Sequence, residues 1–466
     1  MSMSENFAFQ DADALCRMSA TELAAAYRQR SVSPVDVTQA CLARAEEIDP
    51  AFNAFTFIDH DGALEAARAS EARWATGNPL SKVDGVPATL KDIVWVKNWQ
   101  VRFGSSVTSQ APFTEDAPSV RLMREAGVVF LAQTTTPEFG WKAVTDSKAF
   151  GVTVNPHDRN MTAGGSSGGA AVAAMLGAGV FHLGTDGGGS IRIPSAFCGL
   201  TGIKPTFTRV PAYPASAFGT VAHIGPMCRS AEDAFLMLKA MSGRDRHDWN
   251  QGEGQLAPLE WEPMDVKGLR IGYWTTPPAG RLDPEVAAIV DRQMASLEAE
   301  GAVVEPFALP AKDLLETFHV HWFSGAAARL EPFSATERAE IDPGLLEIAD
   351  IGASYDAKRL VAAQTDRANF GARMDQALSE YDFILSPAVT VPAFGAGLNV
   401  PAGSGLRHWT EWASFSFPIN LTQQPAGVVP CGRTEAGLPV ALQVIGARGK
   451  DAHVLSFLAA VDALGN

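Results

Sequence analysis

Several signatures of well-known site types are missing from this sequence. It has no C-x-x-C pair, no H-E-x-x-H, no P-loop and no complete G-x-G-x-x-G pattern. Its five cysteines are an odd number and lie far apart, so we expect reduced core thiols in a cytoplasmic protein. His319 and His321 fall in a helical stretch, where residues two apart face different ways. We therefore expect neither a metal site nor a cofactor.

Basic residues and long apolar runs are also scarce in this sequence. The 37 Lys and Arg are outnumbered by 52 Asp and Glu, giving a net charge of −15. A nucleic-acid surface needs a basic stripe, so we expect no nucleic-acid partner, and the charge also disfavours an anionic substrate. Met1–Gln10 contain no basic residue, which argues against a signal peptide. The uncharged stretch 164–185 is too rich in glycine for a membrane span, so no membrane partner is expected.

The remaining composition is that of a globular protein, with 46% hydrophobic residues. Ser19–Glu22 is a capping-box pattern, and Ser33-Pro34 indicates a second helix start. Strands and helices alternate after residue 84, which favours an α/β fold. We expect a single large mixed β-sheet covered by helices on both faces. We treat 1–466 as one domain. We expect it to contain an N-terminal helical segment (19–80), a core (84–235), an excursion or lid (244–263), a helical cap (311–381) and C-terminal strands (383–446).

Two glycine-serine clusters, 164–169 and 184–192, carry the strongest chemical signal. Ser190 follows Ser166 by 24 positions, enough for one helix and a returning strand that bring both serines to the same end of the sheet. The glycines before Ser190 have no side chains, so the backbone there can turn sharply and expose several N–H groups. Fixed N–H donors of this kind stabilise an oxyanion.

A serine hydroxyl becomes a good nucleophile only when a base removes its proton. No histidine lies in a convincing motif near either cluster, and Lys91, in an apolar segment, is the best candidate base. A lysine acts as a base only when neutral. Lowering its pKa from about 10.4 to about 7 costs about 4–5 kcal/mol, which burial can supply. Asp92 would point to the opposite face of the strand.

The two clusters, GGSSGG and GTDGGGSIR, resemble the motif of the amidase signature family. The resemblance extends over most of the chain, through DGVPATLKDI (84–93), TPEFGW (136–141), IGPMCRSAEDA (224–234), FILSPA (383–388) and GLPVALQVIG (437–446). It departs from the family pattern at Thr135, at Thr162-Ala163 and at 422–425.

The resemblance implies a role for each matched residue. Lys91 would be the catalytic lysine, Ser166 the relay serine following a cis peptide bond from Gly165, and Ser190 the nucleophile that forms an acyl-enzyme. The implied oxyanion hole consists of the N–H groups of Gly187, Gly188, Gly189 and Ser190. The implied supporting residues are Ser167, Thr185, Asp186 and Arg192.

The substrate pocket is expected to be apolar and aromatic, which favours a bulky or aryl substrate. Its candidate residues are Phe139, Gly140, Trp141, Tyr213, Phe218, Trp409 and Phe415. We therefore expect a stand-alone hydrolase, a monomer or homodimer, that cleaves an aryl or alkyl amide or a carbamate (urethane), with esterase as a side activity. The alternatives are a glutamine-hydrolysing A subunit of a transfer-RNA-dependent amidotransferase and a non-catalytic binding subunit.

Overall fold

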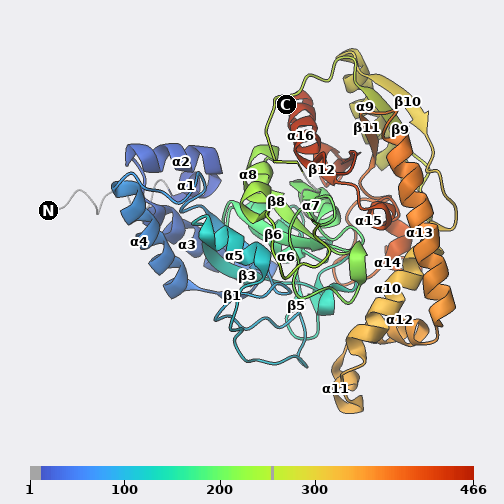
Figure 1. Cartoon of the computed structure of the whole chain (residues 1–466), viewed down its shortest axis with the longest axis horizontal. Helices are drawn as coiled ribbons and strands as arrows, with labels where there is room; N and C mark the ends of the chain where they lie inside the picture. Colours follow the sequence, from blue (N-terminus) through green and yellow to red (C-terminus); the bar gives the residue numbers. More distant parts are fainter. Residues whose placement is uncertain (1–11, 253–256, 466) are drawn as a thin grey trace.

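The computed structural model describes residues 12–252 and 257–465, so the expectation for Met1–Gln10 lies outside the described residues. Eleven strands form one sheet, and β4 and β5 form a separate pair (Figure 1). The strands are β1 (Phe55–Ile58), β2 (Pro87–Lys91), β3 (Val129–Thr134), β4 (Asp146–Ser147), β5 (Gly151–Val152), β6 (Phe181–Asp186), β7 (Thr201–Lys204), β8 (His223–Cys228), β9 (Arg270–Trp274), β10 (Val303–Phe307), β11 (Phe383–Pro387), β12 (Ala426–Arg433) and β13 (Pro439–Ile445).

Helices occupy the segments between the strands. They are α1 (Ala12–Arg17), α2 (Ala20–Gln29), α3 (Pro34–Phe52), α4 (His60–Ala75), α5 (Pro118–Glu125), α6 (Gly168–Leu176), α7 (Arg192–Cys198), α8 (Ala231–Met241), α9 (Pro284–Ala299), α10 (Leu314–Leu330), α11 (Ala335–Glu340), α12 (Pro343–Ala353), α13 (Ala357–Ala377), α14 (Trp409–Trp412), α15 (Phe417–Thr422) and α16 (Asp451–Gly465). Within the described ranges, none of these helices combines the length and the apolar character that crossing a bilayer requires.

The large sheet is mixed, as the alternation of elements predicted. Its strand order is β1-β3-β2-β6-β8-β7-β12-β13-β11-β9-β10. Strand β2 is parallel to both of its neighbours, β3 and β6, whereas β8 runs antiparallel to β6 and β7. The strand that carries Lys91 therefore lies inside the sheet, where its side chains are buried on both faces.

Helices cover both faces of this sheet. Val428 of β12 packs in a cluster with Ala196 of α7. A side chain on the neighbouring Gly427 would instead meet Leu458 of α16. Because successive residues of a strand point to opposite faces, α7 and α16 pack on opposite sides of the sheet. The predicted fold class is thereby confirmed.

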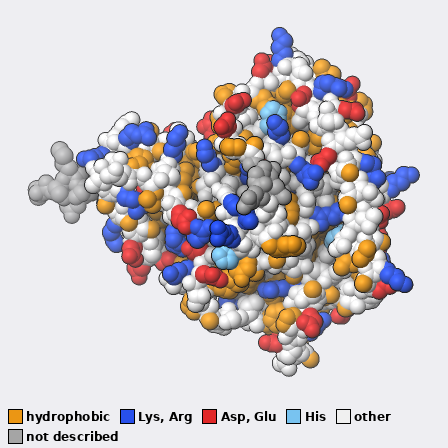
Figure 2. Space-filling model, viewed as in Figure 1, with side chains coloured by type: hydrophobic (Ala, Val, Ile, Leu, Met, Phe, Trp, Pro, Cys, Tyr) orange, Lys and Arg blue, Asp and Glu red, His pale blue; other side chains and the backbone are white. Residues whose placement is uncertain are grey.

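The N-terminal helices begin where their capping residues predicted. Ser19 forms a capping box with Glu22 at the start of α2, and Ser33 does the same at the start of α3, where Pro34 occupies the first turn. Figure 2 shows acidic and basic side chains interspersed over the face that it displays.

The sheet topology brings the two glycine-serine clusters together. Helix α6 and strand β6 fill the interval between Ser166 and Ser190, as their spacing predicted. Because β2 and β6 are parallel neighbours, Lys91 and the loop after Asp186 emerge at the same end of the sheet. Part of the predicted excursion at 244–263, residues 253–256, lies outside the described residues.

Candidate active site

Lys91 is the last residue of β2 and is completely buried. Its Nζ lies within hydrogen-bond distance of three hydroxyl oxygens, Ser166 Oγ at 2.7 Å, Ser167 Oγ at 2.9 Å and Thr185 Oγ1 at 2.9 Å. No carboxylate in the described part of the chain lies within ion-pair distance of this amine. Burial lowers the pKa of Lys91 well below its usual value, and the charge of Asp186 only partly opposes this. The surroundings of Lys91 therefore favour the neutral amine.

Asp92 does not raise the pKa of Lys91 through direct contact. Its carboxylate accepts hydrogen bonds from the backbone N–H groups of Arg102, at 2.7 Å, and Gly104, at 3.0 Å. Lys91 and Asp92 thus reach different partners, as their adjacent positions at the end of a strand predicted.

Ser166 and Ser190 lie on two loops that touch. The peptide bond from Gly165 to Ser166 is cis, as the resemblance implied. The N–H of Ser167 donates to the carbonyl of Ser190 at 3.2 Å, which joins the loops directly. The side chain of Ser190 makes no hydrogen bond to any described residue, and Ser190 is 6% exposed. Its hydroxyl is available to a molecule in the adjoining pocket.

Asp186 holds the loop that precedes Ser190. Its carboxylate accepts two hydrogen bonds from the Arg192 guanidinium, both at 2.9 Å, and one from Asn420 Nδ2, also at 2.9 Å. Burial alone would raise the pKa of Asp186, but the charge and hydrogen bonds of Arg192 keep it below its usual range. Asn420 belongs to this network although nothing in its sequence context marked it.

The glycine loop differs in one respect from the oxyanion hole that the resemblance implied. The N–H of Gly189 donates to Asp186 Oδ1 at 2.8 Å, so this group is already used within the protein. The N–H groups of Gly187, Gly188 and Ser190 have no acceptor among the described residues. Three of the four predicted donors thus remain free, and the fourth holds the loop in place.

Two tryptophans explain why side chains are absent from this loop. A Cβ on Gly187 would lie 2.7 Å from the Trp322 ring, and one on Gly188 would lie 2.6 Å from the Trp409 ring. Both distances are shorter than any ordinary carbon contact. The loop can pass between these rings only because it lacks side chains.

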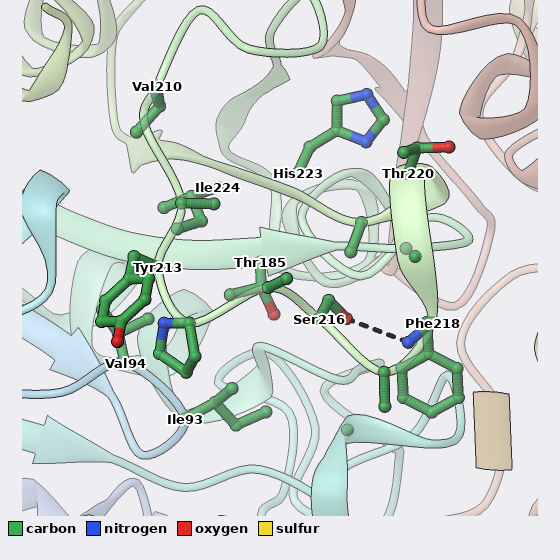
Figure 3. A pocket seen from close by; sticks show the side chains of 18 of the residues that line it. Ile93, Val94, Thr185, Val210, Tyr213, Ser216, Phe218, Thr220, His223 and Ile224 are labelled. Atoms are coloured by element: carbon green, nitrogen blue, oxygen red, sulfur yellow. Dashed lines mark hydrogen bonds between the residues drawn. The ribbon is translucent and has the colours of Figure 1, made fainter. Parts of the chain in front are cut away.

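A cavity of about 390 Å³ adjoins the two serines. Ser166, Thr185, Gly187 and Ser190 line one end of it. In Figure 3, Ile93, Val94 and Tyr213 lie on one side of Thr185 and Phe218 lies on the other. Further apolar lining comes from Trp95, Phe103, Phe139, Phe207, Val210, Ile224 and Trp322.

Four of the seven predicted pocket residues line this cavity: Phe139, Gly140, Tyr213 and Phe218. Gly140 permits a close approach, since a Cβ at this position would lie 3.2 Å from Ser166 Oγ. None of the three positions that depart from the family pattern, Thr135, Thr162-Ala163 and 422–425, is among the described residues that line it.

The other three predicted pocket residues are not among the described residues that line the cavity. Trp141, Trp409 and Phe415 are all buried. The ring of Phe415 packs against Trp274 with a centroid distance of 4.9 Å, and Trp409 packs against Phe318 at 5.9 Å. An aromatic residue in a loop-rich segment can equally well fill a core, so sequence alone does not distinguish a pocket residue from a core residue.

Helix α10 and the segment after α8 contribute lining residues that the sequence did not reveal. Trp322 and Arg329 reach the cavity from α10, and Asp248, Trp249 and Asn250 reach it from the predicted excursion. The separation of seven residues between Trp322 and Arg329 places them on one face of a helix. Nothing in the sequence, however, indicates what that face meets.

His223 is the one histidine among the described residues that line the cavity. Its Nδ1 lies 2.8 Å from the carbonyl of Val221, and in Figure 3 its ring points away from Thr185. Burial also lowers its pKa well below the usual value. His223 is therefore poorly placed to serve as the base. Within the described ranges, no cluster of three or more His, Cys, Asp and Glu side chains is arranged to hold a metal ion.

Comparison with known proteins agrees with this geometry. The model of the family described as Amidase matches residues 36–455. The chain belongs to the amidase signature family. Amidase signature relatives include an acylamidase of Rhodococcus erythropolis, 33% identical over 96% of this chain and 95% of that protein. Another is the A subunit of the glutamyl-tRNA(Gln) amidotransferase of Myxococcus xanthus, 33% identical over 95% of this chain and 96% of its own length.

Solved amidase signature structures share the fold. The crystal structure of a bacterial aryl acylamidase of this family superposes with a TM-score of 0.88 at 26% identity, covering 96% of each chain. As an amidase signature enzyme, the protein is a hydrolase of amide C–N bonds. Its identity to the acylamidase equals its identity to the amidotransferase subunit.

Proposed function

We propose that this protein is a stand-alone amidase that works through an acyl-enzyme on Ser190. The observation that carries the proposal is the environment of Lys91, a buried amine bonded to hydroxyls and unpaired with any described carboxylate. A neutral amine in contact with Ser166 Oγ can take up a proton that Ser166 receives from Ser190.

In the proposed mechanism, Ser190 Oγ attacks the substrate carbonyl as its proton passes to Ser166 and a proton of Ser166 passes to Lys91. The tetrahedral oxyanion accepts hydrogen bonds from the free N–H groups of the Gly187–Ser190 loop. Ser166 then donates a proton to the leaving nitrogen and regains one from Lys91, and the C–N bond breaks. Water then attacks the acyl carbonyl as its proton passes through Ser166 to Lys91. A proton returns through Ser166 to Ser190 Oγ as the ester bond breaks, which releases the acid and restores Ser190.

The proposed substrate is an aryl or alkyl amide, with carbamates and esters as further substrates of the same chemistry. The support is the lining of the cavity, in which aromatic and aliphatic side chains surround the serines. An apolar wall favours an apolar acyl or amine group over a small, fully polar one.

The charges in the cavity argue against free glutamine, the substrate of the alternative function. A zwitterion needs one anionic and one cationic partner. The charged lining residues in the described part of the chain are Asp248 and Arg329. Asp248 already accepts hydrogen bonds from the N–H groups of Ala212 and Asn250, both at 3.0 Å. The pocket therefore offers less to an ammonium group than to an apolar or anionic one.

The test is hydrolysis of a panel containing a p-nitroanilide, a primary amide and a carbamate. Ser190→Ala is expected to reduce turnover of every substrate to the uncatalysed level while the circular dichroism spectrum stays unchanged. Ser242→Ala makes the same chemical change at the end of α8, where the hydroxyl bonds to the carbonyl of Leu238, and should leave rates unchanged. Near-wild-type hydrolysis by Ser190→Ala would refute the mechanism. A glutaminase activity that appears only with added partner proteins would favour the amidotransferase.

We further expect a cytoplasmic monomer or homodimer. The five cysteines are free, which suits a reducing compartment. Sedimentation of the purified protein would decide between the two oligomeric states.

A further inference from the structure

Arg329 stands out among the residues that line the cavity. It lies in the last turn of α10 and is half-buried. Its guanidinium carbon lies 4.7 Å from the ring centroid of Phe103 and 4.6 Å from that of Phe139. No described residue accepts a hydrogen bond from it or offers a carboxylate within ion-pair distance.

The buried arginines Arg192 and Arg209, unlike Arg329, have carboxylate partners. Arg192 forms a two-point contact with Asp186, and Arg209 lies 3.1 Å from the carboxylate of Asp451. A guanidinium carries five N–H donors, and removing them from water without acceptors is costly. Burial accordingly lowers the pKa of Arg329, and no neighbouring charge compensates. The two aromatic faces offset part of this cost but accept none of its N–H groups.

The position of Arg329 relates it directly to the reacting serines. Its guanidinium lies over the ring of Phe139, and the next residue, Gly140, faces Ser166 Oγ. Arg329, Ser166 and Ser190 line the same cavity. One substrate of modest size can therefore occupy both ends, with its amide at the serines and another group at Arg329.

We propose that Arg329 binds a carboxylate of the substrate, so that the preferred substrates are amides bearing an anionic group away from the scissile bond. A guanidinium and a carboxylate match in geometry and form paired, charge-assisted hydrogen bonds. The net charge of −15 does not oppose this locally, because the aromatic rings that Arg329 contacts leave its charge unneutralised. This inference rests on the proposed function, since it concerns the substrate of that site.

Binding to the Ser190→Ala protein tests the inference without requiring turnover. One pair of probes is 4-acetamidobenzoate and its neutral counterpart 4-acetamidobenzamide, with the carboxylate on the amine side. A second pair is glutaric acid monoanilide and its terminal primary amide, with the carboxylate on the acyl side. By calorimetry, the anion of at least one pair should bind about 10- to 100-fold more tightly than its neutral counterpart.

Arg329→Gln, introduced into the Ser190→Ala protein, should reduce that preference to less than about threefold, and Arg329→Lys should retain part of it. Arg359→Gln on α13 is the matched control, because Arg359 pairs with Glu316 and does not line the cavity. It should leave the preference intact.

Equal binding of anion and neutral compound in both pairs would overturn the inference, as would a preference that survives in Arg329→Gln. If Arg329→Gln does not fold, the comparison of the two pairs in the Ser190→Ala protein decides alone. If the wild-type enzyme hydrolyses no member of the p-nitroanilide, primary amide and carbamate panel, the proposed function fails, and the binding result still decides the role of Arg329.

Discussion

Replacing Asp186 by Asn tests how the nucleophile loop is held. The carboxylate is fully buried and accepts hydrogen bonds from Arg192, from Asn420 and from the N–H of Gly189. Asn has almost the same shape but only one acceptor oxygen, and its amide group would face donors. The change therefore leaves the buried guanidinium of Arg192 without a counter-charge.

The expected loss in the free energy of unfolding is about 3–5 kcal/mol, the usual cost of removing one partner of a buried ion pair. The Gly187–Ser190 loop should also lose its fixed conformation. Because each preorganised oxyanion donor contributes about 10²-fold or more to the rate, we expect kcat to fall roughly 10- to 100-fold.

Urea unfolding followed by circular dichroism measures the loss of stability, and kcat on a p-nitroanilide measures the loss of activity. Asp350→Asn is the matched control, because Asp350 is 76% exposed and pairs with Arg338 at 3.3 Å. That substitution should change stability by no more than about 1 kcal/mol. If Asp186→Asn costs less than about 1 kcal/mol and leaves kcat unchanged, the pair with Arg192 does not support the loop.

Two further predictions concern the base and the loop. If Lys91 is the base, kcat/KM rises with pH as the amine loses its proton and reaches its plateau below the usual lysine value of 10.5, because burial lowers the pKa. Lys91→Arg should be inactive at every pH, and activity that increases only above pH 10.5 would contradict a neutral base. Gly187→Ala would push its Cβ against Trp322, at 2.7 Å, and should lower kcat/KM by about 10²-fold through displacement of the loop. Gly371→Ala on α13, where the nearest atom to a Cβ would be Thr422 Cα at 4.0 Å, should leave the rate unchanged, and equal rates for both variants would disprove the steric argument.

Features that depend on neighbours in sequence could be predicted well. Ser19 and Ser33 cap α2 and α3 because a capping box needs only four consecutive residues. The interval between Ser166 and Ser190 holds one helix and one strand because its length and apolar content allow little else. The contact of Lys91 with Ser166 was implied by the family resemblance, and the parallel pairing of β2 with β6 explains it.

Features that depend on packing between distant segments could not be predicted from the sequence. Trp141, Trp409 and Phe415 are aromatic residues of the kind expected in a pocket, yet they are buried and are not among its described lining residues. Gly189 belongs to a run of glycines, yet its N–H is taken by Asp186.

The sequence alone was enough to predict the mixed sheet, the helices that cover it and the candidate reacting groups, because hydrophobic periodicity and a dense motif specify local structure and chemistry. The tertiary structure alone decided which side chains border the substrate. Arg329 meets Phe139 only because tertiary packing brings α10 against the segment that holds Phe139 and Trp141, and a sequence pattern indicates that a face is buried without indicating what it is buried against.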